Sequence, residues 1–309
     1  MQRIIVTGGA GFVGSNLTLA LQAKHPDAEI IVMDDFRSGH FANLRGFQGD
    51  LLSVNVADPG WERHFPKGVD AIFHLASITD TTIMDQKAMV YDNAEGFRRI
   101  LDFAASDSIP VIYASSAATY GKEDAHRAMP EEQPAAPENV YAFSKVILDN
   151  LARIYAKVNP KMKIVGLRYF NVYGPRESHK GKASSMIYQL ACQMKGDQAP
   201  RIFKFGEQKR DFVYVEDIVA GTMAALHARQ SGIYNLGSGE ARSFNDVISA
   251  LNRALRLSFK PEYFDNPYPF YQNFTQADIS RARGDLGYQP KFPLEEGVSH
   301  YIEHWHSIS

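Results

Sequence analysis

The chain has 309 residues, of which 45% are hydrophobic, and a formal net charge of −2 at pH 7. This is enough for one large domain or two unequal domains with buried cores, and the near-neutral charge gives no general attraction to nucleic acid or membrane. No apolar run approaches the ~20 residues of a membrane-spanning helix. The single cysteine, Cys192, excludes an internal disulfide. Because Met1 is followed directly by Gln2, Arg3 and a short apolar strand, we expect a cytoplasmic protein without a signal peptide.

The first half of the chain alternates short apolar runs with stretches of helical periodicity. Apolar strands separated by helices indicate a parallel sheet covered on both faces. Beyond about Phe170 the pattern becomes less regular and is punctuated by prolines. We therefore predict an α/β fold with a Rossmann-type doubly wound parallel sheet over residues 1–168, returning elements around 211–238, and a smaller domain mainly over 169–309. The predicted strands are 4–6, 30–33, 71–73, 111–113 and 164–167, and the predicted helices are 12–24, 85–106, 141–158 and one around 301–305.

A glycine-rich turn joins the first predicted strand to the first predicted helix. Gly8, Gly11 and Gly14 lie in the sequence TGGAGFVG at residues 7–14. A tight turn, a close backbone approach to a pyrophosphate and close helix–strand packing all favour glycine. The helix N-terminus offers N–H groups and a positive dipole to phosphates. The pattern therefore predicts a dinucleotide site.

The choice between NAD and NADP depends on two residues, Asp34 and Arg37, which follow the second predicted strand. Asp34 stands where a carboxylate can accept hydrogen bonds from an adenosine ribose, which favours NAD. Arg37 follows, and a guanidinium there can bind a 2′-phosphate, which favours NADP, although Arg37 could equally be a solvated loop charge. We expect NADP, with NAD as the alternative.

Tyr141 and Lys145 are the strongest catalytic candidates. Residues four apart share one face of a helix, and a lysine ammonium beside a phenol favours the phenolate, so we expect a lowered pKa for Tyr141. Such a tyrosine can exchange protons near pH 7. Ser116 follows the strand predicted at 111–113, at the carboxyl edge of the sheet where ligands bind, and its hydroxyl can hydrogen-bond the oxygen being oxidised.

These motifs together resemble the extended short-chain dehydrogenase/reductase superfamily, in its NAD-dependent epimerase/dehydratase family. The resemblance covers essentially the full length and is carried by TGGAGFVG, Ser116, YAFSK at 141–145 and RYFNVYGPRE at 168–177. The longer phrases GLRYFNVYGPRESHKGKASSM and KRDFVYVEDI are similar to the ADP-glycero-manno-heptose 6-epimerases of lipopolysaccharide core synthesis. The resemblance implies that the smaller domain binds a nucleotide-sugar and that the protein is a homo-oligomer.

The resemblance also implies roles for individual residues. Catalysis is assigned to Ser116, Tyr141, Lys145 and Lys180, with Lys180 as a second acid/base across the substrate. The residues expected to contact the cofactor are Gly8, Gly11, Phe12, Val13, Gly14, Asp34, Arg37, Asn55, Val56, Leu75, Ala76, Asn93, Tyr141 and Lys145. Those expected to contact the substrate are Ser77, Ser116, Asn171, Lys180, Phe203, Arg210 and Tyr271.

The chemistry of inversion favours a redox route. Direct deprotonation at an unactivated carbinol carbon is too difficult, whereas transfer of hydride to a nicotinamide gives a transient ketone, and its return to the opposite face inverts the centre. Two faces favour two acid/bases, Tyr141 and Lys180, and a buried lysine in that role needs a pKa lowered by desolvation. Together with the resemblance to the heptose 6-epimerases, this route predicts an epimerase that inverts C6 of ADP-glycero-manno-heptose with bound NADP or NAD.

Three alternatives differ in the residues that they need. A 4,6-dehydratase needs an acid and a base directly after the site hydroxyl, where this chain has Ala117 and Ala118. A UDP-hexose 4-epimerase needs only Ser116, Tyr141 and Lys145, so it remains open. A non-catalytic nicotinamide-binding regulator is disfavoured because that set is intact. The histidines show no metal-ligand spacing, so we expect no metal site.

Overall fold

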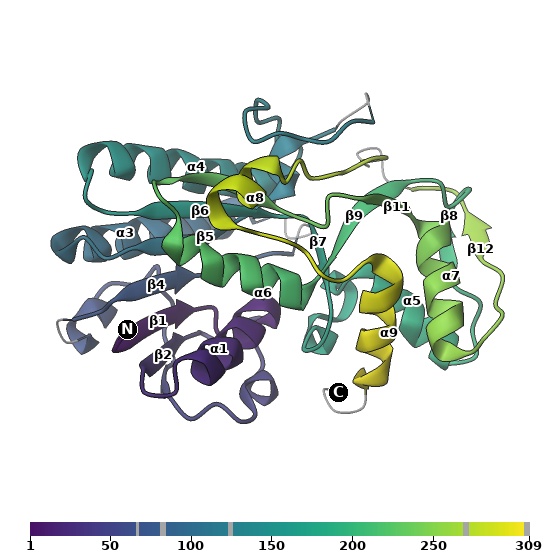
Figure 1. Cartoon of the computed structure of the whole chain (residues 1–309), viewed down its shortest axis with the longest axis horizontal. Helices are drawn as coiled ribbons and strands as arrows, with labels where there is room; N and C mark the ends of the chain where they lie inside the picture. The colour runs from purple at the N-terminus through teal and green to yellow at the C-terminus, as the bar shows by residue number, and fades with distance from the viewer. Residues whose placement is uncertain (66–67, 81–84, 123–125, 268–271, 306–309) are drawn as a thin grey trace.

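A seven-stranded parallel sheet forms the centre of the molecule. The computed structural model describes residues 1–65, 68–80, 85–122, 126–267 and 272–305. The sheet has the order β10-β6-β5-β4-β1-β2-β3, and every adjacent pair is parallel (Figure 1). The doubly wound fold expected from the sequence is therefore confirmed. Its strands are β1 (Arg3–Thr7), β2 (Glu29–Met33), β3 (Asp50–Leu52), β4 (Ala71–His74), β5 (Val111–Ser116), β6 (Ile164–Tyr169) and β10 (Gly232–Leu236).

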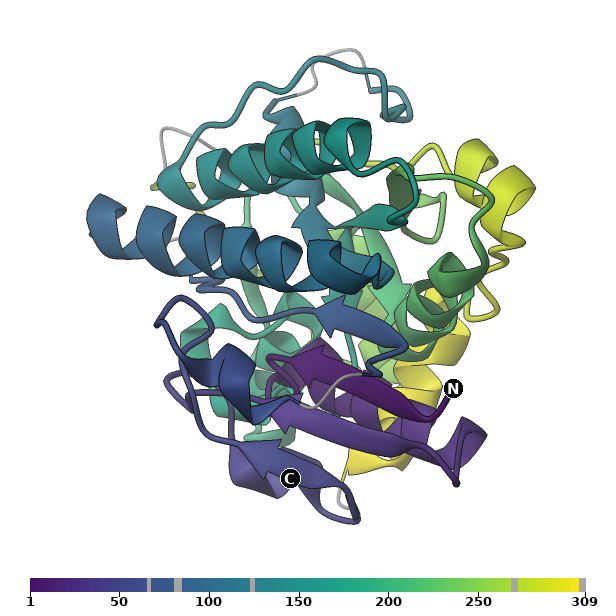
Figure 2. The ribbon, with the colours of Figure 1, turned by 90° about the vertical axis from the view of Figure 1, so that its left-hand side faces the viewer.

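Helices cover both faces of this sheet because successive strand residues point to opposite sides. Ile4 and Val6 pack in one core with residues of α1 and α6, whereas Ile5 packs in a second core with residues of α3 and α4. Figure 2 shows these layers on either side of the strands. The helices are α1 (Phe12–Lys24) and α6 (Val215–Ala224) on one face, and α3 (Gly96–Asp107) and α4 (Val140–Val158) on the other.

The stretch predicted as helical over 85–106 is helical but not uniform. A short α2 (Gln86–Val90) continues into a π-helical turn (Tyr91–Glu95), which leads directly into α3. Such π-helical turns are frequent at functional sites. Here the turn carries Asn93, whose side chain is fully buried and hydrogen-bonds both the backbone N–H and the carbonyl of Ile78. The turn thereby fixes the loop that leaves β4.

The smaller part of the molecule has a core of its own. A three-stranded sheet with the order β11-β9-β7 and a two-stranded pair, β12-β8, pack with α5, α7 and α9 on the right of Figure 1. The strands are β7 (Asn171–Tyr173), β8 (Arg201–Phe203), β9 (Lys209–Tyr214), β11 (Ala241–Ser243) and β12 (Glu262–Phe264). The helices are α5 (Met186–Lys195), α7 (Phe244–Leu255) and α9 (Leu294–Glu303), while α8 (Ser280–Leu286) packs back on β10.

Several connections are short 3₁₀ helices, and one of them, Ser178–Ala183, carries Lys180. The other 3₁₀ helices are Phe41–Leu44, Trp61–His64, Ala117–Tyr120 and Ala225–His227.

No helix in the part of the chain that the structure describes is long and apolar enough to cross a membrane.

Candidate active site

A cavity of about 1250 Å³ opens at the carboxyl edge of the parallel sheet, between the sheet and the smaller part of the molecule. The strand order reverses between β1 and β4, and in open α/β folds ligands bind in the crevice at this point. The wall is built from the glycine turn, the loops after β2 and β4, the end of β5, the start of α4 and segments after β6. The volume is large enough for a dinucleotide and a second ligand together.

The glycine turn has no room for side chains. Gly8 has a φ of +68°, and a Cβ there would lie 2.6 Å from the backbone nitrogen of Ala76. A Cβ on Gly14 would lie 2.0 Å from the carbonyl oxygen of Gly8, so α1 could not pack so closely against the turn with any other residue. Gly8, Gly11, Phe12, Val13 and Gly14 all line the cavity, with α1 beginning at Phe12. This geometry fits a pyrophosphate at the helix N-terminus.

The residues after β2 form a charged edge of the same cavity. Asp34 is buried and accepts hydrogen bonds from the backbone N–H groups of Ala10 and Phe36, each at 2.9 Å, and burial raises its pKa. Arg37 lies 2.5 Å from Asp35 and 2.6 Å from Asp92 through its Nε and Nη1 atoms. A ligand phosphate at Arg37 would have to compete with these two carboxylates.

Tyr141 and Ser116 meet at the end of β5. Ser116 is the last residue of the strand, and its Oγ accepts a hydrogen bond from Ala118 N–H. Tyr141 lies in the first turn of α4, which Asn139 caps through the N–H of Ala142. Burial raises the pKa of Tyr141, and a hydrogen bond with Ser116 works in the opposite direction.

Lys145 lies one turn further along α4. Its Nζ donates a hydrogen bond to the Ala114 carbonyl at 2.9 Å and lies 5.7 Å from the centroid of the Tyr141 ring. Burial lowers the pKa of Lys145 to about 8, while Asp149 acts to raise it. The sequence predicted a lowered pKa for Tyr141, and this is wrong for the structure by itself, because burial of the phenol raises the pKa more than the hydrogen bond with Ser116 lowers it. A lower pKa requires a further positive charge beside the ring.

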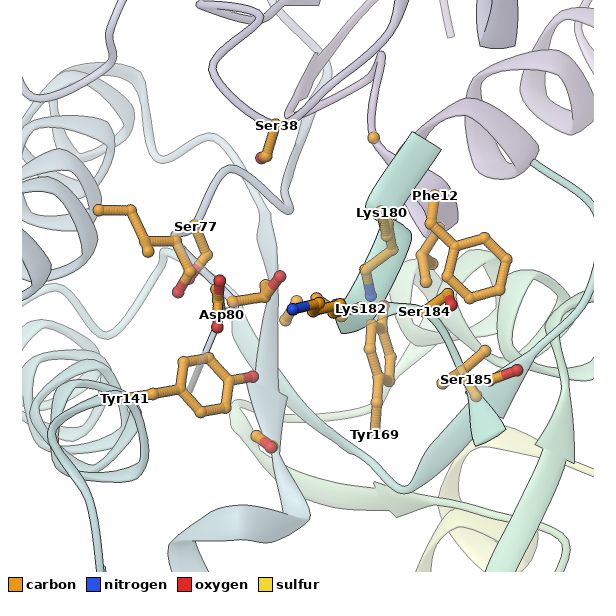
Figure 3. Close-up of a pocket in the computed structure, with 18 of the residues that line it drawn as sticks. Phe12, Ser38, Ser77, Asp80, Tyr141, Tyr169, Lys180, Lys182, Ser184 and Ser185 are labelled. Carbon is orange, nitrogen blue, oxygen red and sulfur yellow. The ribbon is translucent and has the colours of Figure 1, made fainter. Parts of the chain in front are cut away.

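Lys180 faces Tyr141 across the cavity. Figure 3 shows the two side chains on opposite sides, with the phenol oxygen and the amine nitrogen both directed inward. The Nζ of Lys180 lies 5.6 Å from the centroid of the Phe12 ring. Burial lowers the pKa of Lys180, and the carboxylates of Glu177 and Asp80 act to raise it. The expectation of a desolvated lysine is thus met.

Most of the other predicted site residues lie on the same cavity. Asn93 does not line it, since its amide is used behind the wall on Ile78 and on Ser144. Tyr271 lies outside the described residues. The remaining predicted residues that line the cavity are Asn55, Val56, Leu75, Ala76, Ser77, Asn171, Phe203 and Arg210.

A comparison with known families identifies the architecture. A model of the NAD dependent epimerase/dehydratase family matches residues 4–237. The chain belongs to this family. The resemblance found in the sequence is confirmed, and the glycine turn, Ser116, Tyr141 and Lys145 all lie within the matched segment.

Several solved structures of epimerases are similar to this chain over essentially its whole length. The ADP-L-glycero-D-manno-heptose-6-epimerase of Helicobacter pylori is 42% identical, with a TM-score of 0.91 over 99% of this chain and 97% of that chain. The UDP-glucose 4-epimerase of Thermotoga maritima is 26% identical, with a TM-score of 0.91 over 99% of both chains. The UDP-glucuronic acid 4-epimerase of Bacillus cereus, solved with UDP-glucuronic acid and NAD, is 27% identical, with a TM-score of 0.87 over 100% of both chains.

The sequence analysis missed several charged residues that line the cavity of this epimerase/dehydratase family member, among them Asp35, Asp80, Asp92 and Lys182. Figure 3 shows the amine of Lys182 between Tyr141 and Lys180, with Asp80 on the Tyr141 side of the cavity. Asp80 lies in the loop after β4, which also carries the predicted Ser77. Its closeness to the carboxyl end of the strand could therefore have predicted that it lies at the site. Lys182 follows Lys180 by two residues, and its direction depends on the 3₁₀ turn, which the sequence does not reveal.

The described residues contain no group of three or more histidine, cysteine, aspartate or glutamate side chains that could hold a metal ion.

Proposed function

We propose that this protein is a nucleotide-sugar epimerase that inverts C6 of an ADP-linked glycero-manno-heptose. The observation that carries the proposal is the pair of ionisable side chains, Tyr141 and Lys180, on opposite sides of one cavity. The 42% identical heptose 6-epimerase of Helicobacter pylori supports the same substrate. The product would serve lipopolysaccharide core synthesis.

The cavity residues fit a nicotinamide dinucleotide, which would accept a hydride from the sugar and return it. The glycine turn would hold the pyrophosphate through backbone N–H groups, because a side chain at Gly8 or Gly14 would close this space. On the first face of the sugar, Ser116 would hydrogen-bond the reacting hydroxyl and Tyr141 would take its proton. The oxidised cofactor is cationic at the nicotinamide, and with Lys145 it would favour the phenolate against the cost of burial.

On the opposite face, Lys180 would perform the reciprocal proton transfer. Oxidation on one face leaves a ketone, and the second hydride transfer needs a proton donor at the oxygen once the sugar has rotated. An ammonium with a pKa lowered by burial can give up its proton and regain it near neutral pH. Two acid/bases would thus serve the two opposite faces of the same carbon.

We propose NADP as the cofactor, with NAD accepted. Arg37 supports this because it is the cation that lines the cavity beside β2. Asp34, Asp35 and Asp92 oppose it, since carboxylates near a 2′-phosphate repel it. The expected balance is a modest preference that depends on Arg37.

A direct assay of stereochemistry tests the proposed reaction. The protein as purified is incubated separately with each C6 epimer of ADP-glycero-manno-heptose and with UDP-glucose, and the products are identified by proton NMR. Formation of the same equilibrium mixture from either heptose epimer supports the proposal. Conversion of UDP-glucose to UDP-galactose, with both heptoses unchanged, would instead support the 4-epimerase alternative, for which Ser116, Tyr141 and Lys145 suffice. Conversion of none of the three would contradict both.

A further inference from the structure

The segment that carries Lys180 is attached to the cofactor-binding half of the molecule, although it belongs to the smaller part by sequence. Asn16, on α1, donates from Nδ2 to the carbonyl of Pro175 at 3.0 Å. Arg176 returns two hydrogen bonds, from Nη1 to Asn16 Oδ1 at 3.0 Å and from Nε to the Asn43 carbonyl at 3.2 Å. These contacts join positions that are more than a hundred residues apart in the chain.

Asn43 connects the same segment to the glycine turn. Its side chain is buried, and Nδ2 donates to the carbonyl of Ala10 at 2.9 Å and to Nδ1 of His179 at 3.1 Å. Ala10 lies within the glycine turn and His179 immediately precedes Lys180. The side-chain amide of Asn43 therefore links the glycine turn to His179, the residue next to Lys180.

Phe12 completes the connection at the ammonium itself. It is the first residue of α1 and is nearly buried, and its carbonyl accepts a hydrogen bond from Asn16 at 2.9 Å. The Nζ of Lys180 lies 5.6 Å from the ring centroid, within the range of a cation–π contact. Figure 3 shows the ring beside the lysine.

We propose that Asn16, Asn43 and Arg176 form a polar clamp through which the cofactor-binding turn places Lys180, so that these three are positioning residues for the second acid/base. The role of Lys180 rests on the proposed function, whereas the clamp stands on the hydrogen bonds alone. Burial of the Arg176 guanidinium is unfavourable, as the lowered pKa of this residue indicates, and its hydrogen bonds to two different elements offset the cost. The fork geometry of arginine suits this task, and a lysine cannot reproduce it.

The placement of Lys180 can be measured without any substrate. The purified protein, with its cofactor retained, is treated with an amine-acetylating ester, and the acetylation rate of each lysine is followed by peptide mass spectrometry. In Arg176→Gln the rate at Lys180 should rise roughly tenfold, the factor expected for the loss of one or two hydrogen bonds. Lys195 is the internal control, because it is exposed on α5 and lies over the Trp305 ring instead.

A matched variant separates the clamp from a general effect of removing arginine. Arg63→Gln removes a guanidinium that hydrogen-bonds the Gly60 carbonyl of its own loop, so Lys180 should react as in the wild type. If Arg176→Gln leaves the acetylation of Lys180 unchanged, the clamp does not place this lysine and the proposal is overturned. Arg176→Lys should resemble Arg176→Gln more than the wild type.

The two half-reactions provide a second readout. With two acid/bases, one C6 epimer gives up its proton to Tyr141 and the other to Lys180. In Arg176→Gln the first reduction of the bound nicotinamide, followed at 340 nm in a stopped-flow instrument, should slow about 10–100-fold with one epimer and hardly change with the other. Equal slowing with both epimers would contradict a clamp specific to Lys180. If the wild type inverts neither epimer in the NMR assay, the proposed function fails, and the acetylation experiment still decides the clamp.

Discussion

The Nζ of Lys145 lies 5.7 Å from the centre of the Tyr141 ring and at the same time donates a hydrogen bond to the backbone carbonyl of Ala114. The ammonium is therefore fixed beside the phenol by the end of β5, and it does not need a ligand to hold it in place. Such a preorganised cation favours developing phenolate without reorganisation during the reaction.

Tyr141→Phe removes the acid/base oxygen and leaves the ring in place. Turnover of the epimerisation substrate should fall at least 10²–10⁴-fold, because a general acid/base is lost, while the cofactor should remain bound. Turnover is followed by NMR and the cofactor by its absorbance after extraction. Tyr155→Phe is the matched control, since this tyrosine lies on the same helix and contacts Asp102 at the surface. Near-wild-type turnover in Tyr141→Phe would refute its role.

Lys145 makes stability depend on pH in a definite direction. Its pKa is about 8 in the folded protein against 10.5 for an ordinary lysine, so the unfolded chain binds more protons between these values. The cost of burying the charge is present in full below about pH 8 and disappears as the pH rises through 10.5. Relative to Lys145→Met, the wild type should therefore gain about 3 kcal/mol between pH 7 and pH 10.5. Urea unfolding of both proteins at each pH measures this difference, and a constant difference would contradict the lowered pKa.

Lys180→Met tests the second acid/base. Inversion of ADP-heptose should decrease about 10²–10⁴-fold, the loss expected for a general acid/base, with fold and cofactor content unchanged. Lys195→Met is the control, because it also removes a lysine that lies over an aromatic ring, at a distance from the cavity. Normal inversion by Lys180→Met would reduce this lysine to a binding or surface role.

Arg37→Ala tests the choice of cofactor. If the guanidinium binds the 2′-phosphate, the affinity for NADP should fall about tenfold or more, since a charge-assisted hydrogen bond is worth roughly 1.5–3 kcal/mol. The affinity for NAD should hardly change, and it provides the control within the same protein. Titration calorimetry of cofactor-free enzyme with each dinucleotide measures both. Equal losses for the two cofactors would show that Arg37 acts through Asp35 and Asp92 and does not recognise the phosphate.

Asp211→Asn tests a buried carboxylate that joins three segments. Asp211 accepts hydrogen bonds from Ser238 N–H at 2.6 Å, Gly239 N–H at 3.0 Å and Ala277 N–H at 2.9 Å, and burial raises its pKa to about 6. An amide has one acceptor oxygen and would direct its own N–H groups at these donors. The free energy of unfolding should fall by about 1–3 kcal/mol, measured by urea denaturation. An unchanged midpoint would mean that the amide is accommodated by rotation.

Local signals in the sequence were sufficient for much of the parallel sheet. The helix predicted over 12–24 is the observed α1, whose start follows directly from the glycine turn. β10 was anticipated only as a returning element, since it pairs with β6 across an intervening segment of the smaller domain, residues 170–231. Short β3, with its partly exposed residues, carries no clear apolar pattern and was missed.

The site was predictable where a motif fixes a residue on an element, and less so where burial or loop geometry decides. Ser116, Tyr141 and Lys145 were found because a strand end and a helix face bring them together. The pKa of Tyr141 was predicted in the wrong direction, because desolvation is a property of the folded cavity and a sequence does not reveal it. Lys182 was missed because the 3₁₀ turn that carries it decides its direction, whereas Asp80 could have been found from its closeness to the end of β4.

The late position of β10 in the chain affects how the protein is made. β6 ends at Tyr169, yet its outer neighbour, Gly232–Leu236, is translated only after β7, α5, β8, β9 and α6. Until then, the nascent sheet presents the unpaired backbone of β6 as an edge, the type of surface on which chains aggregate. A fragment ending near residue 168 would keep that edge permanently. A ribosome stalled there would therefore carry an aggregation-prone partial sheet and not a complete nucleotide-binding domain.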